Sequence, residues 1–149
     1  ILIYVFIRFK HFNFAIAGVI ALLHDVAVAL GFLSITGRSI DLLSVTAFLT
    51  IAGYSINDTI VIYDRVRENM RLDRKASLRE LINLSVNQTL GRTILTSGVT
   101  LLVVVSFLIY GGEVLSNFAF TLLVGFVSGV YSTVFIASPL VLAWQRRKK

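Results

Sequence analysis

The sequence has no cysteine and only two histidines, so it lacks the residues that many chemistries require. Without cysteine there is no disulfide framework, no thiolate nucleophile and no thiolate metal site. His11 and His24 are far apart in the sequence, which argues against a catalytic zinc site. No phosphate-binding loop or nucleophile motif replaces them. We therefore expect no enzymatic activity and no cofactor other than protons as a coupling ion.

Charged residues are also scarce, at 15% of the 149 residues, whereas 56% of the residues are apolar. The mean hydropathy of +0.85 is far from that of ordinary soluble proteins and predicts a membrane protein. The net charge of +6 does not indicate nucleic-acid binding, because the basic residues lie between apolar runs and at the C-terminus. Orientation in a lipid bilayer explains that distribution better.

Four long apolar runs cover residues 13–35, 42–63, 93–110 and 118–144. Each is long enough to span a bilayer, which requires about 20 helical residues. Short connections between such helices make neighbours antiparallel, so we predict an all-α transmembrane bundle that forms one domain over residues 1–149. Residues 1–7 are apolar but too few to span, and we interpret them as the end of a helix that begins upstream in a longer protein.

Residues 65–92 between the second and third runs differ from the rest of the chain because they are rich in arginine. Within them, Ser77 is followed three residues later by Glu80, which is the pattern of a capping box at a helix start. The apolar spacing that follows predicts an amphipathic helix lying on the membrane surface. A solvated loop containing one helical turn is the alternative.

The orientation follows from the positions of lysine and arginine. All of them except Arg38 fall near residue 8, in the 65–92 segment or at the C-terminus, which are connections on the same side of a four-span bundle. The positive-inside rule places that side in the cytoplasm. The C-terminus is then expected to be cytoplasmic.

Small and polar residues recur at helical spacing in each predicted span, as they do where membrane helices pack closely. They predict a tightly packed bundle with a polar seam. The four sets are Gly18, Ala21, Asp25 and Ala29; Thr46, Thr50, Gly53 and Asn57; Thr93, Thr96, Ser97 and Thr100; and Thr121, Gly125, Gly129 and Thr133.

Ionisable residues inside the spans are the strongest candidates for function, because placing a charge at the centre of a membrane helix costs about 2.5–3.5 kcal/mol or more. Asp58 lies about 10 Å below the predicted cytoplasmic surface, and Arg92 begins the neighbouring span on the same side. A proton relay in which Asp58 alternates between protonation and contact with Arg92 is one interpretation. The alternatives are a packing role for Asp58 and a snorkelling Arg92. His24 and Asp25, near the midplane, are candidates for a second relay group or for a fixed structural pair.

Four segments together closely resemble the SecF family, the smaller partner in the bacterial SecDF protein-export membrane complex. They are "ALLHDVAVALGF" (21–32), "TIAGYSINDTIVIYDRVREN" (50–69), "NQTLGRTILTSGVTLLVV" (87–104) and "GVYSTVFIASPL" (129–140). The resemblance implies the fold of the RND exporters, with six spanning helices and a large extracytoplasmic domain between the first two. This chain then holds the end of the second helix and helices three to six, without the first helix and the outer domain.

The resemblance also implies a role and partners. Such a subunit works with SecD to assist preprotein translocation through SecYEG in the bacterial inner membrane, using the proton-motive force, and YajC and YidC are further candidate partners. The family pattern assigns the functional charges to Asp58 and Arg92, and we place Asn57, His24 and Asp25 in a supporting polar core. A structural subunit that docks SecD and the translocon without relaying protons is the alternative; the specific motifs disfavour a small-molecule exporter.

Overall fold

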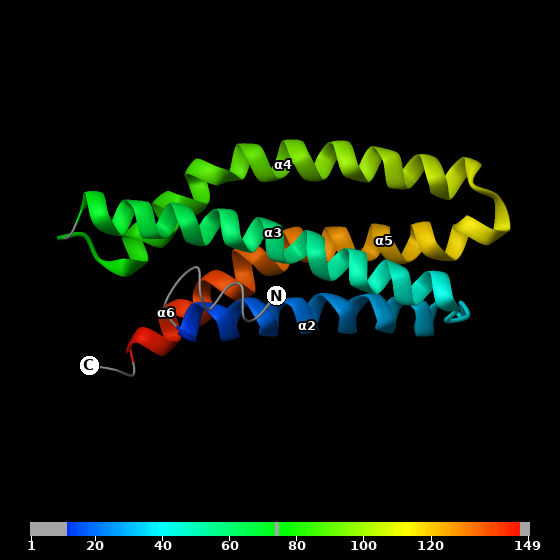
Figure 1. Ribbon diagram of the computed structural model, residues 1–149, viewed down its shortest axis with the longest axis horizontal. Helices are drawn as coiled ribbons and strands as arrows, with labels where there is room; N and C mark the ends of the chain where they lie inside the picture. Colours follow the sequence, from blue (N-terminus) through cyan, green and yellow to red (C-terminus); the bar gives the residue numbers. More distant parts are fainter. Residues whose placement is uncertain (1–11, 74, 147–149) are drawn as a thin grey trace.

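The computed structural model describes residues 12–73 and 75–146, which form a bundle of helices without any strand in those ranges (Figure 1). The elements are α2 (Phe12–Ile35), α3 (Leu42–Leu72), α4 (Leu78–Tyr110), α5 (Gly112–Ser132), the π-helix η1 (Thr133–Ala137) and α6 (Ser138–Arg146). The all-α prediction is confirmed. The predicted partial span at residues 1–7 lies outside the described residues.

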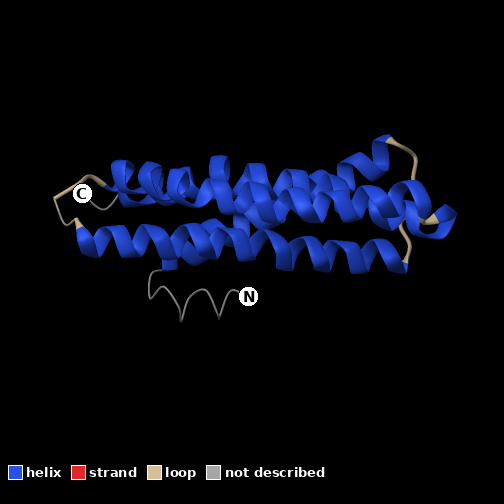
Figure 2. Cartoon of the chain, turned by 90° about the horizontal axis from the view of Figure 1, so that it is seen from above, coloured by secondary structure: helices blue, strands red, loops and turns tan. Residues whose placement is uncertain are grey.

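Four helices in the described part of the chain are long and apolar enough to cross a membrane, as the sequence predicts. They cover Asn13–Ile35, Leu42–Leu72, Leu78–Tyr110 and Gly112–Trp144, and the last of these combines α5, η1 and most of α6. Two views at right angles show the long helices lying along one common axis, with the connections at the two ends (Figures 1 and 2). Consecutive spans are therefore antiparallel.

The connection between α2 and α3 is short because both helix ends are capped by local residues. Gly37 adopts φ +65°, a backbone conformation that glycine accepts readily, and the amide of Arg38 returns to the carbonyl of Leu33 at 3.0 Å. Asp41 then caps α3: its Oδ1 accepts from the backbone N–H of Ser44 at 2.7 Å and from the Ser44 hydroxyl at 2.8 Å. These two hydrogen bonds hold the pKa of the exposed Asp41 carboxyl below its ordinary value of 3.8.

The segment 65–92 differs from the prediction. Helix α3 continues to Leu72 and α4 already begins at Leu78, so the surface helix is the first part of a spanning helix and the loop is short. The capping box at Ser77 and Glu80 is confirmed. No proline interrupts either helix, and the polar residues find partners across the helix pair: the side-chain amide of Asn69 donates to Ser85 at 2.8 Å and to Gln88 at 3.0 Å. The first part of α4 therefore packs against α3.

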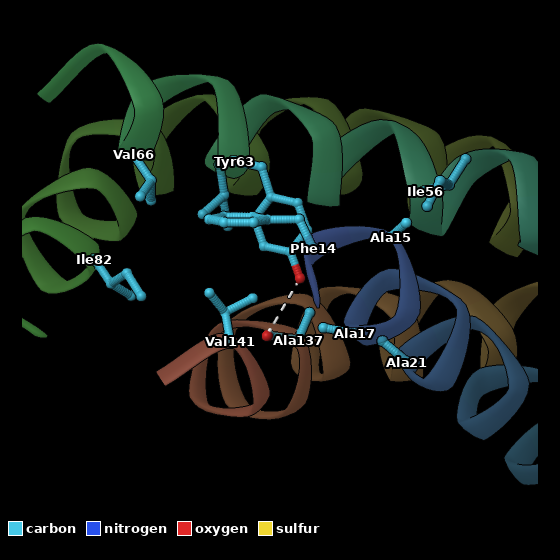
Figure 3. Packing of buried hydrophobic residues seen from close by; sticks show 11 residues of the cluster. Phe14, Ala15, Ala17, Ala21, Ile56, Tyr63, Val66, Ile82, Ala137 and Val141 are labelled. Atoms are coloured by element: carbon cyan, nitrogen blue, oxygen red, sulfur yellow. Dashed lines mark hydrogen bonds between the residues drawn. The ribbon is translucent and has the colours of Figure 1, made fainter. Parts of the chain in front are cut away.

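The last span is the most buried of the four and α4 is the least buried. Two groups of buried apolar side chains surround α5 and its continuation. One group joins α2, α3, the first part of α4, η1 and α6 around Phe14 and Tyr63, whose rings meet edge to face with centroids 4.9 Å apart (Figure 3). The other joins α2, α3, α4 and α5 around Ile51 and Phe126. Helix α5 is thus the element against which the others pack.

Gly125 allows α3 to approach α5 closely. A β-carbon at this position would collide with the side chain of Ile51, including Cγ1 and Cδ1. At Gly129, one turn further along, a β-carbon would make only ordinary contacts, 3.5 Å from Ser55 Cβ and 3.7 Å from Asp25 Oδ2. Both glycines belong to the set predicted to pack closely and both are buried, as expected, but they are under different constraints.

The π-helix interrupts the last span just before Pro139. Proline lacks an amide hydrogen and its ring disfavours a regular α-helix over the preceding turn, so a local widening of the helix accommodates it. Side chains replace some of the lost backbone bonds: the Ser138 hydroxyl donates to the carbonyl of Thr133 at 3.1 Å, and the Tyr63 hydroxyl donates to that of Ala137 at 3.3 Å (Figure 3). The break in this helix is therefore tied to α3.

The Gly125 contact predicts a difference between two substitutions. Gly125→Ala is expected to destabilise the protein by about 1–3 kcal/mol, because Ile51 must leave a well-packed position. Gly129→Ala is the matched control and is expected to cost less, since its new methyl group meets no such obstacle. Thermal unfolding of the purified full-length protein in detergent measures both. An equal loss for the two variants would contradict this account of the packing.

The Asp41 cap predicts a pH-dependent stability. Because folding lowers the pKa of this carboxyl, its contribution is complete above about 3.8 and is lost as the pH falls through the lower folded value. The difference in unfolding temperature between the natural protein and Asp41→Ala is therefore expected to be larger at pH 7 than at pH 3. Asp41→Asn still accepts the hydrogen bonds but does not titrate, so it serves as the control. A difference between wild type and Asp41→Ala that is independent of pH would be the contrary result.

Candidate functional site

Asp25 lies at the centre of a polar cluster that joins three helices. Its side chain is fully buried, and its Oδ2 accepts hydrogen bonds from the hydroxyls of Ser55 on α3 at 2.6 Å and Ser132 on α5 at 2.7 Å. Its Oδ1 accepts from the Ser128 hydroxyl, also on α5, at 2.8 Å. Both carboxylate oxygens are thus occupied as acceptors by protein groups, which is how a buried polar group avoids the cost of losing water.

His24 completes this cluster from the outer side of α2. Its Nδ1 lies 3.2 Å from Asp25 Oδ1 and donates to that oxygen in the tautomer that carries a proton on Nδ1. The imidazole is 36% exposed, whereas the Asp25 side chain is entirely covered. Both residues were predicted to lie in the polar core, and the structure brings them into contact, with Asp25 inside and His24 at the edge.

Asp58 is buried in a different way. Only 7% of its surface is exposed, and its Oδ2 has no hydrogen-bond partner within the described part of the chain. An unsatisfied buried oxygen of this kind is uncommon in folded proteins and calls for an explanation. Asp58 is thus a carboxyl group in an apolar bundle without the hydroxyl donors that surround Asp25.

Arg92 acts on Asp58 by charge rather than by contact. The arginine is exposed on α4, and its positive charge acts electrostatically on the Asp58 carboxyl on α3. No ion pair or hydrogen bond joins the two side chains in the described structure. The structure therefore brings Asp58 and Arg92 to the same α3–α4 interface, but their side chains are not in contact.

A groove between α3 and α4 leads towards this pair. It has a volume of about 780 Å³. Its lining includes four arginines, one of which is Arg92, together with Val61, Gln88, Asp64 and Glu68. Along its wall, Arg65 pairs with Glu68 at 2.6 Å and donates to Gln88 at 2.6 Å. Val61 is three residues after Asp58, so the carboxyl lies about one helical turn from the lining of the groove. Polar surface thus reaches Arg92 and ends close to Asp58.

Asn57 does not belong to the core of this chain. It is exposed, as are the three residues grouped with it in the sequence analysis, Thr46, Thr50 and Gly53. The inner face of α3 is formed instead by residues that include Ser44, Ala47, Ile51, Ser55, Asp58 and Thr59. Polar residues occupy two faces of α3, and spacing alone does not tell which one faces inward. The prediction for this span was therefore wrong, and the second polar face points out of the bundle.

The polar sets predicted for the other three spans differ in how many of their residues are buried. The sets of the first and fourth spans are buried throughout, as predicted. In the third span Thr93 and Ser97 are buried, whereas Thr96 is exposed. The Thr96 hydroxyl donates a hydrogen bond to the backbone carbonyl of Arg92 at 2.9 Å. The exposed threonines of α3 do the same, since Thr50 donates to Thr46 O at 2.9 Å. These hydroxyls satisfy themselves within their own helices.

The three serines that bind Asp25 were not predicted. One signal in the sequence pointed to two of them: Ser128 and Ser132 are four residues apart and so share a helix face. Serine is common in membrane helices for packing, which hid this role. Within residues 12–73 and 75–146 no cluster of three or more His, Asp or Glu side chains is arranged to hold a metal ion.

The chain is similar to known proteins over nearly its whole length. The family model described as protein export membrane protein SecD/SecF, C-terminal, matches residues 1–147. Protein translocase subunit SecF of Rhodothermus marinus is 48% identical over 153 residues, covering 99% of this chain and 49% of that protein. The SecF subunit of Desulfurispirillum indicum is 49% identical over 150 residues, covering 99% and 48%. The chain spans about half the length of these curated relatives.

Two solved structures share the fold. A crystal structure of SecDF in the super-membrane-facing form matches with a TM-score of 0.93 and 46% identity, over 99% of this chain and 20% of that chain. The crystal structure of SecDF from Thermus thermophilus, described as a translocon-associated membrane protein, matches with a TM-score of 0.93 and 46% identity, over 97% of this chain and 20% of that one. The sequence match over nearly the whole chain and the shared helix arrangement lead to one conclusion: the chain belongs to the SecD/SecF family of protein-export membrane proteins.

Proposed function

We propose that this chain is the membrane part of a SecF subunit that works with SecD and uses the proton-motive force to assist preprotein translocation. The observation that carries the proposal is the state of Asp58, a buried carboxyl with one oxygen unpartnered, about one helical turn from a groove that contains Arg92. A carboxyl with no fixed partner can take up and release a proton without first breaking a hydrogen-bond network. Asp58 is therefore the proton-binding residue and Arg92 its electrostatic partner.

The energetic scale supports a coupling role. One proton that moves across 100 mV releases about 2.3 kcal/mol, and burial of a charged aspartate in a membrane helix costs about 2.5–3.5 kcal/mol or more. The two quantities are similar, so proton binding can bias a two-state equilibrium of a few kcal/mol. In the charged state Asp58 is drawn towards Arg92; in the neutral state that attraction is absent. The alternation moves α3 relative to α4.

The groove supplies the route for the proton on one side. It lies at the end of the bundle that carries the α3–α4 connection, which the distribution of lysine and arginine assigns to the cytoplasm. The proposal thus places the protein in the bacterial inner membrane with a cytoplasmic C-terminus. Protons released from Asp58 leave through the groove, past Arg92.

The outward polar face of α3 supports SecD as the partner. Gly53 and Asn57 are exposed at the level of Asp58, and Thr46 and Thr50 continue the same face. Exposure of an amide side chain to lipid is unfavourable, and a second protein helix with polar groups is a better environment. We place SecD on this face. SecYEG and the translocating preprotein are the further partners, and YajC and YidC extend the assembly.

A structural subunit that docks SecD without relaying protons is the second candidate. The Asp25 cluster favours it, because both oxygens of this buried carboxylate accept hydrogen bonds from hydroxyls on other helices. Asp58 separates the two candidates, since it lacks such partners. Neither candidate requires enzymatic activity.

Asp58→Asn tests the proposal, because it keeps the shape of the side chain and removes its titration. In vesicles that contain the full-length SecF–SecD complex, this variant is expected to lose nearly all proton-gradient stimulation of preprotein export. Asp73→Asn is the matched control: it makes the same chemical change at the exposed C-cap of the same helix and is expected to retain the stimulation. Normal stimulation in Asp58→Asn, with normal assembly, would leave only the docking role.

A further inference from the structure

The bundle contains two buried carboxyl groups in opposite situations. Each oxygen of Asp25 accepts at least one hydrogen bond from a hydroxyl on α3 or α5, and His24 lies beside it. Asp58 has an oxygen without a hydrogen-bond partner in the described part of the chain. The oxygen–oxygen distances around Asp25 are 2.6–2.8 Å. These are direct hydrogen bonds between protein groups. Asp25 is built as a fixed anchor.

The anchor acts on α3 through one residue. Ser55 is the member of the cluster that α3 contributes, and it precedes Asp58 by three residues, which is a rise of about 4.5 Å along the helix. Residues three apart on a helix are neighbours on the same side of it. The hydrogen bond from Ser55 to Asp25 therefore holds the turn of α3 that carries Asp58.

Two neighbouring contacts hold the same stretch of α3 less strongly. The hydroxyls of Thr59 and Thr133 lie 3.3 Å apart, and Tyr63 donates to Ala137 O at 3.3 Å. Both are neutral hydrogen bonds to the π-helix, whereas the bond of Ser55 is short and has a carboxylate acceptor. Charge-assisted hydrogen bonds are roughly twice as strong as neutral ones. Among these contacts, the Asp25–Ser55 bond is thus the main attachment of the segment that carries Asp58.

We propose that Asp25 is a positioning residue for proton coupling: by binding Ser55 it holds Asp58 at the depth and angle from which Arg92 acts on it. This inference rests on the proposed function of Asp58. The charged or titratable groups that face the two carboxyls in the described structure are His24 from α2, beside Asp25, and Arg92 from α4, which acts on Asp58. η1 contains no charged residue, and the charged residue of α5, Glu113, lies in its first turn, fifteen residues before Ser128. The electrostatic environment of Asp58 therefore depends on where α3 holds it.

Two serine variants separate positioning from simple stabilisation. Ser55→Ala and Ser128→Ala each remove one buried hydroxyl that donates to Asp25, but only Ser55 belongs to the helix of Asp58. Both are expected to lower the unfolding temperature of the full-length SecF–SecD complex by similar amounts. Only Ser55→Ala is expected to move the midpoint of the pH profile of proton-driven export, by about one pH unit, because only it frees Asp58 to change its distance from Arg92.

Ser55→Cys keeps the experiment decisive if Ser55→Ala does not yield folded protein. The thiol is a weaker hydrogen-bond donor than the serine hydroxyl but has a similar shape. The pH midpoint is therefore expected to move less than in Ser55→Ala. Equal displacement in the Ser55 and Ser128 variants, or none in either, would overturn the positioning role. Asp58→Asn, measured in the same vesicles, separates the two proposals. If it abolishes proton-driven export while the Ser55 variants keep the natural profile, only the positioning role fails; if it has no effect, the proposed function itself fails.

Discussion

The cost of burying a carboxylate among apolar helices is the constraint on which the rest of this structure depends. Two aspartates, Asp25 and Asp58, carry this cost, and their surroundings differ. At Asp25 the cost is offset by hydroxyl donors brought in from two other helices, which binds α2, α3 and α5 together. At Asp58 the cost is only partly offset: one carboxyl oxygen has no hydrogen-bond partner in the described structure, and Arg92 acts through its charge without contacting the carboxyl. The first arrangement favours rigidity and the second favours change.

Close packing makes both arrangements possible. Gly125 lets α3 approach α5. One turn further along α5, Gly129 lies beside Ser55 and Asp25, which are within hydrogen-bond distance of each other. The π-helix before Pro139 remains tied to α3 through Tyr63. Helix α3 is thus held along much of its length by the inner face that also carries Asp58, and the groove between α3 and α4 lies about one helical turn from that carboxyl. A movement of α4 relative to this fixed helix is the smallest change that brings Arg92 to Asp58.

The sequence predicted the large features because they follow from long apolar runs. Four helices of spanning length, the buried glycine face of the last span and the capping box at Ser77 are present as expected. The expected surface helix proved to be the start of α4, because a helix boundary in a basic, proline-free segment depends on tertiary partners such as Asn69 and Ser85. Periodicity indicated that α3 has a polar face, but it did not choose between the face of Asn57 and that of Ser55.

The central claim is that Asp58 gains and loses a proton during work, and infrared spectroscopy tests it most directly. Difference spectra of the reconstituted full-length SecF–SecD complex, recorded across the working pH range, report the carboxyl band of this residue when compared with spectra of Asp58→Asn. We predict a band that appears and disappears with pH and is absent from the variant. A single charge state of Asp58 throughout that range, in every conformation of the complex, would contradict the account.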